Sequence, residues 1–104
     1  MDLPVAWSPE AVEDLELIAE YIARDSDYYA SAVVDEILGV SRKIGALPRA
    51  GRPVPEAGDP AIREDFVYSY RLVYRIEAER VLVVAVIHGK RLLENVPNRF
   101  GKGE

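Results

Sequence analysis

SYRLVYRIEAERVLVVAVIH, residues 69–88, is the stretch that decides the fold, because its hydrophobic pattern changes partway along. Residues 69–77 alternate between two faces, as in a half-buried strand. Residues 80–88 are almost continuously apolar, as in a central strand that is covered on both faces. Residues 78–79 predict a tight connection between these two strands. The alternation predicts one face with Tyr70, Leu72, Tyr74 and Ile76 and another with Arg71, Val73, Arg75 and Glu77.

Two helices are predicted ahead of these strands. The first begins at Ser8, a candidate N-cap, with Pro9 at the first helical position. Apolar residues recur at helical spacing across residues 12–22 and again across residues 30–44. The sequence RDSD at 24–27 interrupts this pattern and can cap the second helix.

Shorter strands are expected at residues 3–7 and 62–66, and the Gly- and Pro-rich residues 49–60 are expected to form a loop. The predicted element order is therefore β-α-α-β-β-β. This order is typical of an α+β fold, with a two-helix hairpin packed on a small antiparallel sheet. The chain has 104 residues, which suits a single domain that spans residues 1–104.

Composition narrows the classes of function. The chain has no cysteine and a single histidine, so we expect no disulfide, no metal and no cofactor. The N-terminus lacks a signal-peptide pattern, and no apolar run reaches the roughly 18 residues of a membrane span, so we expect a cytoplasmic protein. The net charge of −5 disfavours a protein that mainly grips nucleic acid, although its nearly neutral second half can present a local cationic patch.

Basic residues gather around the last two predicted strands. Arg71 and Arg75 fall on one strand face, and Arg63 is expected to join them from the neighbouring strand. Such a cluster suits a phosphate or a carboxylate-rich peptide, because guanidinium groups match the geometry of oxyanions. The candidate residues for binding a partner are Arg63, Arg71, Arg75, His88, Lys90 and Arg91.

Ordinary structural roles remain open for the same residues. The arginines can belong to a solvated sheet face on which they pair with Glu64, Glu77 or Glu79. Histidine is the residue type used most often for acid–base chemistry, which suits His88, but a histidine at a strand end also commonly binds a backbone group.

The sequence resembles toxins of the RelE/ParE superfamily, the toxic halves of bacterial toxin–antitoxin pairs. The resemblance covers nearly the whole chain and lies in the order of SPEAVEDLELIAEYIA, GRPVPE, IRE, YRLVYRIE and VVAVIHGKR. It implies the β-α-α-β-β-β fold and a cognate antitoxin protein as partner. It also implies that operator DNA is contacted only through the antitoxin.

The superfamily contains two activities. RelE-like members are ribosome-dependent mRNA endonucleases, whereas ParE-like members inhibit DNA gyrase. Arg71 and Arg91 match two phosphate-contacting arginines of the nucleases. The lysines of the nucleases correspond here to Ile62 and Glu64, and their tyrosine corresponds to Pro97. Three motifs of this chain follow the ParE pattern instead: IRE, YR..YR and V.HG.R.

The resemblance therefore implies a ParE-like toxin that inhibits DNA gyrase, a topoisomerase, and is neutralised by its antitoxin. No catalytic residue is assigned under this hypothesis. A first alternative is a metal-independent, ribosome-dependent mRNA endonuclease that uses Arg71, Arg91 and His88. In this alternative Glu64 or Glu56 would be the base. A second alternative is a non-toxic regulatory subunit that remains bound to the antitoxin.

Overall fold

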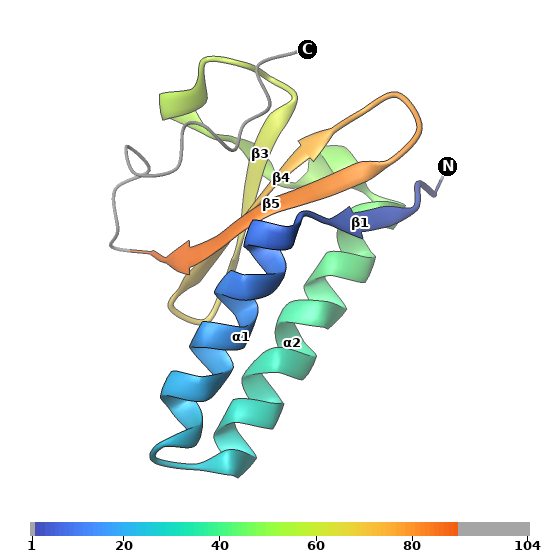
Figure 1. Cartoon of the computed structure of the whole chain (residues 1–104). Helices are drawn as coiled ribbons and strands as arrows, with labels where there is room; N and C mark the ends of the chain where they lie inside the picture. Colours follow the sequence, from blue (N-terminus) through green and yellow to red (C-terminus); the bar gives the residue numbers. More distant parts are fainter. Residues whose placement is uncertain (1, 90–104) are drawn as a thin grey trace.

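The computed structural model describes residues 2–89 of the chain, which form two helices and a five-stranded sheet (Figure 1). The helices run side by side as a hairpin, and the strand order in the sheet is β1-β5-β4-β3-β2. Short 3-10 turns lie at Pro48–Ala50 and Pro55–Ala57. The elements are β1 (Val5–Trp7), α1 (Pro9–Ala23), α2 (Asp27–Ala46), β2 (Arg52–Pro53), β3 (Ile62–Val67), β4 (Tyr70–Ile76) and β5 (Val81–His88).

The predicted α+β fold is confirmed, with one strand added to the sheet and one strand pair that is parallel. The segment expected to be only a loop contains β2, which pairs antiparallel with β3. This strand has two residues and ends in Pro53, which only an edge strand accommodates, so no periodic signal marks it in the sequence. The first strand pairs parallel with β5, Val5 opposite Val81, so the sheet is mostly but not wholly antiparallel.

Both helices begin at serine caps. The Ser8 hydroxyl accepts a hydrogen bond from the backbone N–H of Ala11 at 3.1 Å, and Pro9 follows as the first helical residue. Ser26, within RDSD, accepts the N–H of Tyr29 at 3.1 Å. These bonds satisfy N–H groups that a helix start leaves without an internal partner, and they confirm both predicted starts.

The sheet is buried on both faces, as predicted for its central strand. The helix-side cluster contains Ala11, Ile37, Ile44, Val67, Leu72, Tyr74, Val81, Val83 and Val86. The opposite face, called the outer face below, carries Val54, Ile62, Val73, Val84, Ala85 and Ile87. Leu72 and Tyr74 thus face the helices, and Val73 faces away from them, as the alternation predicts.

A β-bulge in β5 changes which residues of that strand face the helices. Val73 of β4 lies opposite Ala85 and Tyr74 lies opposite Val83, so Val84 is the extra residue. Before the bulge, Val81 and Val83 face the helices, whereas beyond it Val86 does so. The bulge therefore shifts the alternation by one residue and sets the facing of the end of the strand.

Candidate functional site

A buried ion-pair network lies on the outer face of the sheet. Glu64 of β3 is 1% exposed and Arg71 of β4 is 7% exposed. One carboxylate oxygen of Glu64, Oε1, accepts hydrogen bonds from Arg71 Nε at 2.9 Å and from Arg71 Nη2. The other, Oε2, accepts from Arg52 Nε at 2.5 Å. Such pairing is what allows a carboxylate to be buried without a prohibitive loss of solvation.

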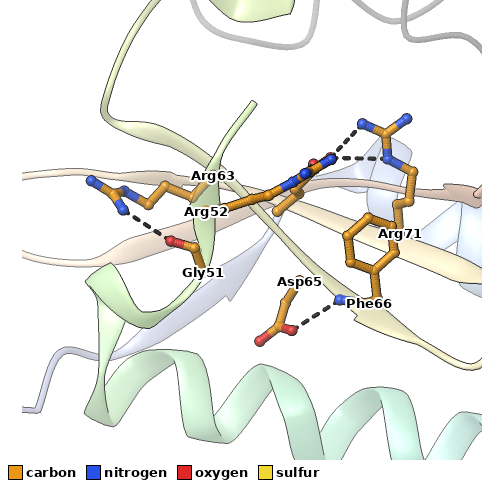
Figure 2. Close-up of polar contacts among 7 residues, drawn as sticks. Gly51, Arg52, Arg63, Asp65, Phe66 and Arg71 are labelled. Atoms are coloured by element: carbon orange, nitrogen blue, oxygen red, sulfur yellow. Dashed lines mark hydrogen bonds and ion pairs between the residues drawn. The ribbon is translucent and has the colours of Figure 1, made fainter. Parts of the chain in front are cut away.

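Phe66 completes this network (Figure 2). It lies directly opposite Arg71 on the neighbouring strand and is 50% exposed. The guanidinium carbons of Arg52 and Arg71 lie 5.6 and 6.0 Å from the centroid of its ring, within cation–π range. We call Arg52, Glu64, Phe66 and Arg71 the Glu64 cluster. It holds two guanidinium groups and one carboxylate.

Arg63 is not part of this cluster. It lies opposite Tyr74, so its side chain leaves the sheet on the helix side. Its guanidinium donates to the backbone oxygens of Pro60 at 3.0 Å and Gly51 at 2.9 Å, and Figure 2 shows it directed away from Arg71. The expectation that Arg63 joins Arg71 on one face is therefore corrected. Arg71 lies opposite Phe66, and Arg63 is three positions from Phe66 on β3, so the alternation of the strand turns Arg63 to the other face. A binding role for Arg63 stays a prediction.

Arg75 shares the outer face with Arg71 but not its network. It lies opposite Ile62, an outer-face core residue, and is partly exposed. Its Nε lies 3.9 Å from the carboxylate of Glu77, which also accepts from Arg80 Nε at 2.6 Å. The arginines of β4 thus pair with Glu64 and Glu77, two of the acids that the structural alternative names.

His88 lies on the helix side, across the sheet from the Glu64 cluster. Its ring contacts Tyr70 edge to face, with centroids 5.8 Å apart. It lines a groove of about 330 Å³ between α1 and β5, which we call the α1–β5 groove. Nearby, Asp14 accepts the backbone N–H of Val86 at 3.0 Å. The groove residues are Asp14, Leu17, Ile18, Tyr21, Tyr70, Val86, Ile87 and His88.

Two of the predicted binding residues, Lys90 and Arg91, lie outside the described residues, as does Pro97. Two residues of the Glu64 cluster, Arg52 and Phe66, are absent from the sequence-based candidates. Arg52 lies in the Gly- and Pro-rich segment, where no pattern indicates that a strand brings it beside Glu64.

Tyr74 is a buried tyrosine whose surroundings change its pKa. Burial raises its pKa above the ordinary value of 10.0, and Asp65 adds to this effect. A backbone hydrogen bond with Gly51 and the charge of Arg63 act in the opposite direction. Its hydroxyl donates to the backbone oxygen of Pro48 at 2.6 Å, so it anchors the end of α2 to the sheet.

Within residues 2–89, no group of three or more His, Cys, Asp and Glu side chains is arranged to hold a metal ion. In the same range, neither helix is both long enough and apolar enough to cross a membrane.

The solved structures that share the fold include two toxin–antitoxin structures and one free toxin. The chromosomal ParDE toxin–antitoxin system of P. aeruginosa is 16% identical, with a TM-score of 0.69 over 83% of this chain and 95% of that chain. The RelBE2 toxin–antitoxin complex of Mycobacterium tuberculosis is 21% identical, with a TM-score of 0.62 over 85% of this chain and 92% of that chain. A free-state mutant of the E. coli toxin RelE is 16% identical, with a TM-score of 0.68 over 96% of this chain and 95% of that chain.

A search of curated protein sequences gives no match to the chain. The model of one protein family, however, matches residues 5–93, which is most of the chain and nearly all of the described fold. That family is described as the ParE toxin of the type II toxin–antitoxin system parDE. The chain therefore belongs to the ParE toxin family and is the toxin of a type II toxin–antitoxin system.

Proposed function

We propose that this toxin acts by binding and inhibiting DNA gyrase, and that it does not cleave RNA. The observation that carries the proposal is the position of Arg71, Glu64 and His88. Arg71 and Glu64 are paired and buried on the outer face, whereas His88 lies on the helix side. RNA cleavage through a 2′-OH needs a proton acceptor and a proton donor within reach of one phosphate. A donor and an acceptor on opposite faces of a sheet do not meet this requirement.

The main alternative is a ribosome-dependent mRNA endonuclease. The fold similarity to RelE favours it, but at 16% identity that similarity concerns the fold alone. The base that this alternative names is Glu64 or Glu56, and both oxygens of Glu64 already accept hydrogen bonds from arginine. The side chain of Glu64 is also fully buried, so a 2′-OH of RNA cannot reach its carboxylate.

The antitoxin is the second partner of the toxin, and we propose that it covers the α1–β5 groove. Leu17 and Tyr21 are 56% and 67% exposed beside the groove, an unusual exposure for large apolar side chains. In addition, β1 pairs only with residues 81–83, so β5 extends beyond it. An apolar groove beside the end of this strand is suited to an amphipathic helix.

Two assays on one preparation test the proposed target. Purified toxin is incubated with gyrase and relaxed plasmid, and in parallel with translating ribosomes and a reporter mRNA. We expect loss of supercoiling or accumulation of cleaved plasmid, together with intact mRNA. Cognate antitoxin added in molar excess is the control and should restore supercoiling.

Cleaved mRNA with unaffected gyrase would replace this proposal with the nuclease. If neither target responds and the antitoxin still binds, the chain is a non-toxic regulatory subunit.

A further inference from the structure

The Glu64 cluster has the geometry of a site for an oxyanion. Arg71 directs two nitrogens to one oxygen of the carboxylate, and Arg52 directs its Nε to the other oxygen. Two guanidinium groups that converge on two oxygens of one group form the arrangement with which arginine binds phosphates and carboxylates. In this protein the bound oxyanion is the side chain of Glu64.

The Glu64 cluster has a buried floor and an exposed rim. The side chain of Glu64 is 0% exposed, and that of Arg71 is 9% exposed, so both form the floor of the site. The side chain of Arg52 is 62% exposed, and Phe66 is half exposed beside it. A molecule in solution therefore reaches the rim but finds the floor already occupied.

We propose that Glu64 is an internal ligand that fills an oxyanion site built by Arg52 and Arg71, and that it closes this sheet face to phosphate groups. An internal carboxylate competes strongly with free phosphate because it is tethered beside its arginines at a high effective concentration. Glu64 is thus a specificity determinant that excludes phosphate-bearing ligands from the outer face. The proposal concerns anion binding alone, so it stands or falls independently of gyrase as the target.

An ordinary ion pair would behave differently when the carboxylate is removed. If the arginines form only an ordinary ion pair, Glu64→Gln should destabilise the fold by the same amount in phosphate as in chloride of equal ionic strength. If they form an oxyanion site, the variant should bind an added oxyanion, and that anion should restore the lost stability. The response to phosphate therefore distinguishes the two explanations.

The experiment uses the full chain and inorganic pyrophosphate as the probe. Calorimetry compares the wild type with Glu64→Gln, which keeps the shape of the side chain and removes its charge. Glu16→Gln, at an exposed position of α1, is the matched control because it changes the net charge equally. We expect Glu64→Gln to bind pyrophosphate at least ~10-fold more tightly than the wild type and Glu16→Gln do. This gain in affinity should be lost in the double variant Glu64→Gln/Arg71→Gln.

Thermal unfolding provides a second readout if Glu64→Gln is poorly folded at low salt. Sodium phosphate should raise its unfolding temperature more than sodium chloride of equal ionic strength does, and the wild type should not show this difference. Two results would overturn the proposal: equal affinity of Glu64→Gln and Glu16→Gln, or a gain that persists without Arg71. Equal stabilisation by phosphate and chloride would also overturn it, since it would indicate general screening.

Discussion

Arg71 and His88 project from opposite faces of the sheet, although Tyr70, the residue before Arg71, lies directly opposite His88. Their separation follows from the bulge at Val84. If all these residues were kept but paired without the bulge, strict alternation from Val81 and Val83 would turn His88 to the outer face, beside Arg71. The bulge therefore separates the two groups that a metal-free nuclease would need together.

We expect His88→Ala to retain toxicity. The His88 side chain is exposed and contacts the ring of Tyr70, so its loss should cost at most about 1 kcal/mol of stability or affinity. Removal of a true general acid would instead reduce the rate by roughly 10²–10⁴. Growth arrest after induction without antitoxin measures the difference. Loss of arrest in a folded His88→Ala protein, with mRNA cleavage by the wild type, would establish the nuclease.

The sequence alone predicts those parts of the fold that follow from local periodicity and capping. Ser8 and the alternation through Leu72 and Tyr74 are examples, because the neighbours that decide them lie within a few residues. The bulge at Val84 could not be predicted, because it lies in a run of apolar side chains that suit either facing. The contact between Arg52 and Glu64 also could not be predicted, because it depends on a two-residue strand with no pattern of its own.

Arg71→Ala should strongly destabilise the protein. It leaves the buried carboxylate of Glu64 with only the exposed Arg52, and breaking a buried pair in this way typically costs about 3 kcal/mol or more. Arg80→Ala is the control, because the ion pair of the half-exposed Arg80 side chain with Glu77 should contribute less than about 1 kcal/mol. Urea unfolding measures the free energy of unfolding of both variants. Equal losses would mean that the buried network stabilises the fold no more than an exposed ion pair does.

Gly51→Ala should destabilise the fold, whereas Gly39→Ala should stabilise it. A Cβ atom at Gly51 would lie 2.3 Å from the Tyr74 hydroxyl and 2.8 Å from the backbone oxygen of Glu64, so the loop would have to move. We expect a loss of about 2 kcal/mol from this overpacking. At Gly39, inside α2, the nearest atom is the flexible end of Arg42 at 3.8 Å, and helix propensity favours alanine by up to about 1 kcal/mol. Chemical unfolding of the two variants should show opposite signs.

Stability should fall at alkaline pH, in part through Tyr74. Its pKa in the folded state is raised above 10.0 by burial, so the folded protein holds this proton more tightly than the unfolded chain does. The resulting stabilisation is fully present below pH 10 and is lost as the pH rises through the raised pKa. Tyr74→Phe removes the titrating group and the bond to Pro48, so it should be less stable at pH 7 and lose less between pH 10 and 12. If the stability of the wild type and that of Tyr74→Phe fell equally between pH 10 and 12, the pH dependence would not come from Tyr74.

Leu17→Glu should weaken the antitoxin complex without unfolding the toxin. The side chain is 56% exposed on the wall of the α1–β5 groove, so a carboxylate is tolerated in the free protein but would be desolvated under a bound apolar segment. We expect a loss of affinity of about 10- to 100-fold, which corresponds to roughly 1.4–2.8 kcal/mol. Leu47→Glu makes the same change at a 60% exposed leucine next to the end of α2, away from the groove, and should leave the affinity unchanged. Calorimetry with the cognate antitoxin compares the two, and if Leu47→Glu weakens binding while Leu17→Glu does not, the antitoxin covers the other end of the hairpin.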